Sequence, residues 1–240
     1  MDIMKLRHQI AASGLGLFLL TQPLTAGALE EGATAVLRGD YATAIQLLEP
    51  LANGGNAPAR FTLGFLYLNG YGVPKDLNKG LELYELSAAQ GYAEAQYNLG
   101  VIYDNGSDVP RDYEEALKWY SLAATQGHAK AEYNLASLYL SGLGTEQNFP
   151  LGVKWLKLSA LHGASAAQNH LGALYAEGKG VKQDFVIAHM WFNVAAQSSD
   201  GEIRDRAIKN RETVAKKMTA EDFAVAQQMA RDWLTVHKKK

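Results

Sequence analysis

The chain has 240 residues, of which 48% are hydrophobic and 20% charged, and its formal net charge is −2 at pH 7. It contains no cysteine, which excludes disulfide bridges, thiolate zinc sites, cysteine nucleophiles and a lipid-modified cysteine. Residues 29–200 hold 11 Lys and Arg against 18 Asp and Glu, whereas residues 201–240 hold 10 against 6. We therefore expect no nucleic acid partner, because nucleic acid requires a positive track along its phosphates.

Residues 1–28 have the layout of a secretory signal peptide. A basic start precedes an apolar run at residues 10–20 and the small residues Ala26, Gly27 and Ala28. This order predicts export with cleavage after Ala28, and so a periplasmic or secreted protein with no transmembrane segment after cleavage. The apolar run is shorter than the about 20 residues of a membrane-spanning helix. An uncleaved N-terminal anchor and an ordinary buried helix stay open as alternatives.

Residues 29–56 carry a weakened copy of the pattern that follows them. Gly39, Asp40 and Ala44 stand 36 residues before Lys75, Asp76 and Gly80, and Leu47, Leu48 and Gly55 keep the same step. We interpret this segment as a degenerate N-terminal repeat or cap, since the terminal unit of a solenoid has one face in water.

Residues 57–199 repeat with a constant period of 36, which divides them into the units 57–92, 93–128, 129–164 and 165–199. Three columns define the register: a leucine, a tyrosine four residues later and a glycine three residues after that. Their members are Leu63, Leu99, Leu135 and Leu171, then Tyr67, Tyr103, Tyr139 and Tyr175, then Gly70, Gly106, Gly142 and Gly178. A period this regular indicates a repeat architecture.

Each unit is predicted to form two antiparallel helices joined by a short turn. In the clearest copy the helices span 93–105 and 113–126, with apolar residues at helical spacing in both. The turn begins with glycine, which ends a helix in the left-handed conformation, and closes with Asp or Asn, which caps the next helix. The capping positions are Asp76, Asp112, Asn148 and Asp184.

The motifs resemble the Sel-one-like repeat, a relative of the tetratricopeptide repeat. The resemblance rests on Ala-Gln-Tyr-Asn-Leu-Gly-Val-Ile-Tyr at 95–103 and Glu-Glu-Ala-Leu-Lys-Trp-Tyr-Ser-Leu-Ala-Ala-Thr-Gln-Gly at 114–127, and it covers all four units. It implies an all-α fold, a right-handed superhelical α-solenoid of antiparallel helix pairs. Three positions depart from the pattern: Leu83, Asp108 and Ala136. At Asp108 the turn is expected to follow a different backbone path.

Residues 200–240 are predicted to cap the array with two helices, 201–217 and 220–236, and a basic tail. Thr219 and Asp222 have the spacing of a capping box. The stretch from Ala188 onward resembles the C-terminal cap of exported bacterial members of the family, and this resemblance is the reason for expecting a bacterial periplasm.

No catalytic signature, cofactor motif or metal site is found in the sequence. The motifs HExxH, GxSxG, SxxK, the phosphate-binding loop and the dinucleotide-binding glycine pattern are all missing. The six histidines lack paired metal-ligand spacing, and the acidic turn at 104–108 lacks the ligand ladder of a calcium loop. We therefore expect no cofactor, no metal and no enzymatic activity.

The remaining candidate sites are surface positions on the first helix of each unit. By resemblance to the tetratricopeptide arrangement, residues two before and two after the repeat leucine face a concave groove. The candidates are Phe61, Phe65, Tyr97, Val101, Tyr133 and Ser137, with Asn169 and Ala173 in the last unit. Aromatic rings there provide anchors for a peptide. The alternative is that Phe61, Tyr97 and Tyr133 pack between adjacent first helices.

The sequence thus predicts a non-catalytic exported scaffold that binds a protein or peptide partner in the solenoid groove. Two other functions stay open. One is a cell-wall or β-lactam hydrolase, an activity implied only by resemblance to cysteine-rich relatives. The other is a subunit of a cell-envelope assembly.

Overall fold

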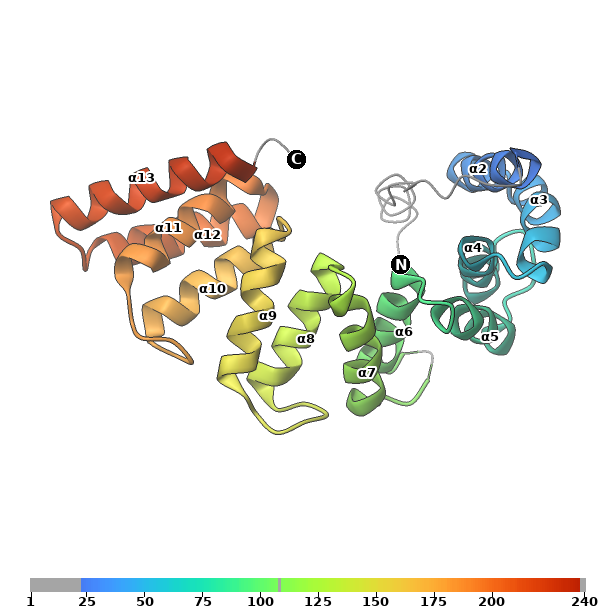
Figure 1. The fold of residues 1–240 in the computed structure, drawn as a ribbon, viewed down its shortest axis with the longest axis horizontal. Helices are drawn as coiled ribbons and strands as arrows, with labels where there is room; N and C mark the ends of the chain where they lie inside the picture. The colour runs from blue at the N-terminus through green and yellow to red at the C-terminus, as the bar shows by residue number, and fades with distance from the viewer. Residues whose placement is uncertain (1–22, 108, 238–240) are drawn as a thin grey trace. The chain divides into compact units, whose positions relative to one another are not determined.

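The computed structural model describes residues 23–107 and 109–237, and every regular element in these ranges is an α-helix (Figure 1). The first six helices are α2 Pro23–Arg38, α3 Tyr41–Asn53, α4 Ala57–Asn69, α5 Leu77–Ala88, α6 Ala93–Asn105 and α7 Tyr113–Thr125. The next six are α8 Ala129–Ser141, α9 Phe149–Leu161, α10 Ser165–Glu177, α11 Phe185–Ser198, α12 Gly201–Ala215 and α13 Ala220–His237.

Three parts of the sequence interpretation fall wholly or partly outside the described residues. They are most of the predicted signal peptide, the departure at Asp108 and the lysines of the basic tail. The predicted cleavage point after Ala28 lies within α2. Among residues 26–38 of α2, the buried ones are Gly32, Ala35 and Val36.

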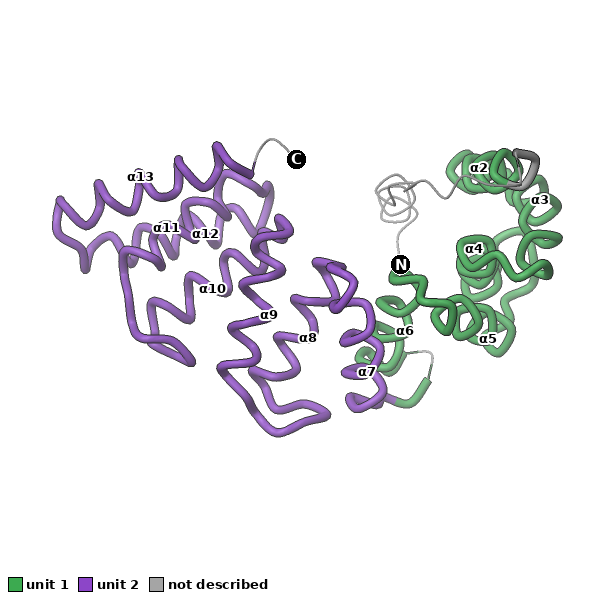
Figure 2. The backbone as a smooth tube through the Cα atoms, in the orientation of Figure 1, with its two compact units in different colours: residues 1–110 green, residues 111–240 purple. Residues whose placement is uncertain are grey.

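The chain divides into two compact units, Met1–Pro110 and Arg111–Lys240 (Figure 2). In the first unit, each helix from α2 to α6 packs against the next helix along the chain. In the second unit, consecutive helices from α7 to α12 pack in the same way, and α13 lies along α11. This pattern confirms the predicted all-α repeat solenoid of helix pairs, because each helix shares its apolar face with its sequence neighbours.

The turns within the repeats have the chemistry that the sequence predicts. Gly142 follows α8 with a φ of 68°, and its amide N–H donates to the carbonyl of Leu138. A side chain with a Cβ is strained in this left-handed conformation. At the far end of the same turn, the Asn148 side chain accepts from the amide of Leu151, 3.0 Å away. Asp76, Asp112 and Asp184 cap their helices in the same way.

Small residues bring the two helices of one repeat close together. A Cβ placed on Gly64 of α4 would lie 3.0 Å from the carbonyl oxygen of Gly80 in α5 and 2.7 Å from Cδ1 of Tyr84. The same column in α10 holds Gly172, where a Cβ would lie 2.7 Å from Cε1 of Phe192. Glycine in this column therefore makes room for a large ring from the partner helix.

A column of hydrogen-bond donors joins successive repeats. The side chain at the fourth position of the first helix reaches back eight residues to a carbonyl at the end of the preceding helix. Three such bonds are present: Arg60 Nε to Ala52 O at 2.9 Å, Gln96 Nε2 to Ala88 O at 3.0 Å and Gln168 Nε2 to Ala160 O at 3.2 Å. Each of these carbonyls lies in the last turn of a helix, where it also accepts from the amide of a glycine three residues later, so the side chain adds a second hydrogen bond at the helix end.

The two C-terminal helices cover the last repeat as predicted. The Trp191 and Trp233 rings meet edge to face with centroids 5.6 Å apart, and Ala230 and Leu234 are buried beside them. Thr219 and Asp222 form the predicted capping box: the Thr219 hydroxyl accepts from the Asp222 amide at 3.1 Å, and the Asp222 carboxylate accepts from the Thr219 amide at 3.3 Å. The predicted helix 220–236 is α13.

Candidate functional site

The candidate partner-binding residues of α4 lie in the core of the first unit. Phe61 and Phe65 are 2% and 1% exposed. The Phe61 ring stacks on Tyr84 with centroids 5.1 Å apart and is tilted against Tyr92 at 5.4 Å, whereas Phe65 lies 5.8 Å from Tyr71. Burial among these rings removes both phenylalanines from the surface that a partner contacts without rearrangement. Phe61 is a packing residue, as in the alternative interpretation, but its ring partners lie on α5 and at the start of α6 and not on the α4 and α6 faces alone.

The equivalent residues of α6 are only partly buried. Tyr97 and Val101 stand one turn apart on this helix and each retains some exposure. Burial, together with the negative charges of Glu94 and Asp104, raises the pKa of the Tyr97 phenol. Tyr97 therefore presents a neutral ring to the solvent, with an apolar side chain beside it.

In the second unit, Tyr133 and Ser137 occupy the same positions on α8 and are also partly exposed. The Tyr133 ring meets His170 of α10 edge to face, with centroids 6.1 Å apart, and part of it packs against the apolar core. Burial lowers the pKa of His170, so this imidazole is uncharged at neutral pH. Two adjacent first helices thus place neutral rings side by side.

The corresponding face of the last repeat is covered by α12. The side-chain oxygen of Asn169 accepts from Nδ2 of Asn210 at 3.2 Å, and Ala173 packs against the cluster of Ala188, Phe192 and Val214. The capping helix therefore contacts Asn169 and Ala173, although both keep partial exposure. In this unit the part of the candidate surface for which the described residues show no such contact to α12 is the one that α8 and His170 provide.

A buried carboxylate forms the most unusual polar contact of the second unit. Glu132 of α8 is 1% exposed, and its Oε2 lies 2.8 Å from Nδ1 of His162 at the end of α9. Burial raises the pKa of Glu132, and the hydrogen bond from His162 with the charges of His162 and His128 partly offsets this effect. His128 caps α8 by accepting from the amide of Ala131 at 3.1 Å. The spacing of the histidines in the sequence did not predict this contact.

A cavity of about 730 Å³ opens beside His162. Its lining includes Leu161 and His162 at the end of α9, Gln168 of α10, Ser198 at the end of α11, and Trp233 and His237 of α13. A volume of this size falls within the usual range for ligand sites. Sequence reasoning missed this cavity, because part of its lining comes from α13, a helix outside the repeats.

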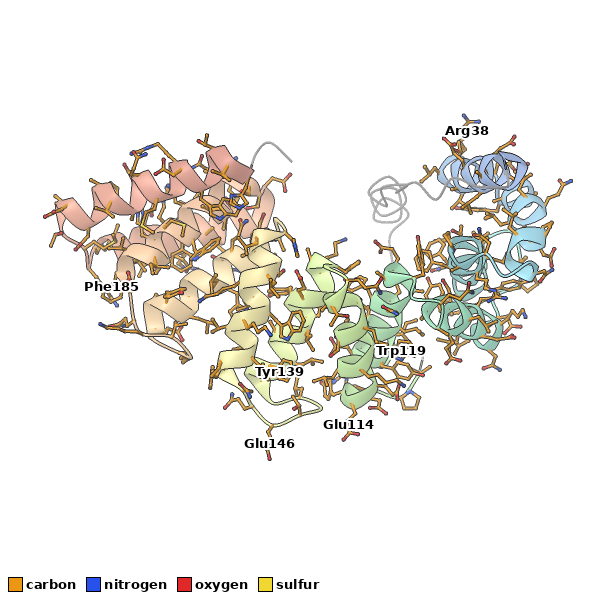
Figure 3. All side chains as sticks on the ribbon, viewed as in Figure 1. Arg38, Glu114, Trp119, Tyr139, Glu146 and Phe185 are labelled. Carbon is orange, nitrogen blue, oxygen red and sulfur yellow. The ribbon has the colours of Figure 1, made fainter. Side chains whose placement is uncertain are left out.

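The second unit also presents aromatic rings covered by lysines. Lys118 Nζ lies 5.0 Å from the Trp119 ring centroid, and Lys154 Nζ lies 5.8 Å from that of Trp155. Figure 3 labels Trp119 on α7 and a further aromatic residue of this unit, Phe185, at the start of α11. Each ammonium group sits over a ring face, where the ring quadrupole attracts a cation.

Over residues 23–107 and 109–237, no group of three or more His, Asp or Glu side chains is placed to hold a metal ion. Over the same ranges, no helix combines the length and the apolar character that crossing a membrane requires.

Comparison with solved structures finds several similar folds. A Sel1 repeat protein from Oxalobacter formigenes is 28% identical with a TM-score of 0.69, and the match covers 88% of this chain and all of that one. The protective antigen c5321 of uropathogenic Escherichia coli, which has an SLR fold, is 27% identical with a TM-score of 0.53. That match covers 89% of this chain and 54% of the antigen.

Immunity protein Pa5087 of Pseudomonas aeruginosa is 19% identical with a TM-score of 0.50, over 90% of this chain and 85% of that one. At this identity the likeness concerns the fold alone. A comparison with curated proteins finds no match.

The Sel1 repeat model matches five consecutive segments of the chain, 26–56, 57–92, 93–128, 129–163 and 165–200. The first segment identifies the degenerate leading unit as a repeat of the same kind. These five segments cover most of the chain and coincide with the helix pairs from α2 to α11. The chain therefore belongs to the Sel1 repeat family.

Proposed function

We propose that this protein is a non-catalytic, exported scaffold that binds a protein or peptide partner through the exposed faces of its first helices. In the second unit the binding surface consists of Tyr133 and Ser137 on α8, and in the first unit Tyr97 and Val101 on α6 form a candidate face of their own. Phe61 and Phe65 belong to neither face, since they are buried among other rings.

The observation that carries the proposal is the pairing of Tyr133 and His170 on adjacent first helices. Neutral rings that are half-buried lose little side-chain entropy on binding and supply a large contact area, which is why aromatic anchors dominate many interfaces. In a repeat scaffold, the columns that face solvent are free to vary while the core columns keep the fold.

Export is the second part of the proposal. Its support is the signal-like order of residues 1–28. Fractionation with N-terminal sequencing tests it. A periplasmic protein that begins at Leu29 supports export, and a cytoplasmic protein that retains residues 1–28 contradicts it.

The binding surface is tested by pull-down from a periplasmic extract with three immobilised proteins. These are the wild type, the double variant Tyr97→Ala/Tyr133→Ala and the control Lys130→Ala, which changes an exposed residue of α8. We expect the double variant to lose partners that the control retains, with both variants as helical as the wild type by circular dichroism. Identical partner sets for all three proteins would remove the surface assignment.

The absence of catalysis has its own test. Purified protein incubated with a chromogenic β-lactam and with peptidoglycan fragments should give no turnover above buffer. Turnover that follows the protein through purification would replace the scaffold proposal with a hydrolase.

A further inference from the structure

The cavity beside α13 lies where the repeat pattern changes one side chain. His162 and Ser198 stand 36 residues apart and hold equivalent positions in the last two repeats, as do Glu132 and Gln168. In the repeat at 129–163, Nδ1 of the His162 imidazole lies 2.8 Å from Oε2 of Glu132. In the next copy, 165–200, the equivalent of that imidazole is the short side chain of Ser198.

This change leaves a buried acceptor without a partner. Gln168 has no exposed surface, and its Nε2 donates to the carbonyl of Ala160. Its Oε1 has no hydrogen-bond partner among the residues that the structure describes. A buried acceptor left unpaired costs about 1–3 kcal/mol, so a donor that enters the cavity gains from supplying the missing bond.

Another part of the lining already holds an imidazole against an aromatic ring. The ring of His237 stacks on Trp233 with centroids 4.1 Å apart and planes within 8°, and both residues line the cavity. Leu161 and Leu234 add apolar surface. The lining therefore combines flat apolar walls with one buried acceptor, which suits a flat ring that carries an N–H group.

We propose that this cavity binds an imidazole side chain presented by a protein partner, as a histidine inserted from outside. The ring N–H donates to Oε1 of Gln168, as His162 does to Glu132 in the preceding repeat, and the ring lies against Trp233. Oε1 exposes almost no surface in this structure, so binding requires the Gln168 amide to turn toward the ring. The occupant's origin rests on the proposed scaffold function, but the site is separate from the surface at Tyr97 and Tyr133.

The test uses two small probes at pH 7.5, where imidazole is largely neutral. N-acetyl-histidine methylamide carries the ring N–H, and N-acetyl-phenylalanine methylamide is the matched ring without it. Binding is followed by the indole N–H resonance of Trp233 in the ¹⁵N-labelled protein. We expect a saturable shift with the histidine probe and at least tenfold weaker binding of the phenylalanine probe.

Two variants assign the site. Ser198→His restores the repeat's own imidazole, so it should abolish probe binding and raise the thermal unfolding midpoint. Gln168→Met keeps the volume but removes Oε1, and it should weaken the histidine probe at least tenfold. Equal shifts with both probes, or an unchanged shift in Ser198→His, would overturn the proposal. Tyr133→Ala should leave probe binding intact, which separates this result from the test of the scaffold surface.

Discussion

Oε2 of Glu132 lies 2.8 Å from Nδ1 of His162. Glu132 is an acid at the fourth position of α8, where the first helices of other repeats carry a hydrogen-bond donor. The equivalent residues Arg60, Gln96 and Gln168 each donate to a carbonyl eight residues earlier. An ionised Glu132 has no hydrogen to offer to the carbonyl of Ala124. The junction between α7 and α8 therefore has a different side-chain hydrogen bond from the junctions that precede α4, α6 and α10.

Replacing Glu132 by Gln should stabilise the protein at neutral pH by about 1 kcal/mol, because glutamine supplies the donor that the neighbouring joints use. The pKa of Glu132 is raised in the folded state. The wild-type carboxyl therefore contributes most stability below its unfolded pKa of about 4.3 and loses that contribution as pH rises through the folded pKa.

Urea unfolding of wild type and Glu132→Gln across this pH range measures the effect. The advantage of the variant should be large at pH 7 and shrink toward pH 4. Glu146→Gln, in the loop between α8 and α9 where the side chain projects away from the helices (Figure 3), controls for loss of a surface carboxylate. An advantage that grows as the pH falls would contradict this explanation.

Removing the hydroxyl of Tyr84 should stabilise the first unit by about 1 kcal/mol. Tyr84 is 1% exposed, and its hydroxyl has no hydrogen-bond partner within the described part of the chain. The equivalent position in the last repeat is Phe192, which shows that a ring without a hydroxyl fits this column. Chemical denaturation of Tyr84→Phe measures the change, and a loss of stability above about 1 kcal/mol would indicate an ordered partner for the hydroxyl.

Two glycines with similar backbone conformations separate the cost of strain from the cost of a clash. Gly144 and Gly163 both have positive φ, at 68° and 87°. A Cβ on Gly144 would collide with the backbone carbonyl of Tyr113, whereas a Cβ on Gly163 meets nothing within 4 Å.

We expect Gly163→Ala to cost about 1 kcal/mol of unfolding free energy and Gly144→Ala to cost at least about 2 kcal/mol more. Thermal and urea unfolding of the two variants provide the comparison. Similar losses would mean that the turn after α8 moves away from α7 at little cost.

The capping box at the start of α13 should contribute about 1 kcal/mol, the usual value for such caps. Thr219→Ala removes the hydroxyl that accepts from the Asp222 amide. Thr235→Ala is the control, because its hydroxyl donates to the Arg231 carbonyl within the same helix and caps nothing. Equal stability of the two variants by thermal unfolding would assign no role to the cap.

The helices and turns were predictable from the sequence because their chemistry is local. Gly142 and Asn148 specify the end of one helix and the start of the next within seven residues, and the structure confirms both. The helix α6 at Ala93–Asn105 has the bounds that the spacing predicts.

The exposure of the candidate site was less predictable, because it depends on contacts between elements. The sequence places Phe61 and Tyr97 in the same column, but Phe61 is buried among Tyr84 and Tyr92 whereas Tyr97 keeps partial exposure. Similarly, Asn169 contacts α12 only because that helix docks on α10.

One overlooked signal was present in the sequence. An acid at position 132, in a column with Gln96 and Gln168, indicates a different hydrogen-bonding role, and His162 follows it by 30 residues. The cavity could not be found in this way, since its roof comes from Trp233 and His237 on a helix outside the repeats.

The proposed binding surface is tested most directly by photo-crosslinking in the cell, with a photoreactive amino acid placed in turn at Tyr133, Ser137 and Glu146. Tyr133 and Ser137 lie one turn apart on α8, and Glu146 lies in the loop after it. The scaffold account predicts one crosslinked product, of the same mass and identity, from positions 133 and 137 and none from position 146. Products of equal yield from all three positions, or products from position 146 alone, would contradict it.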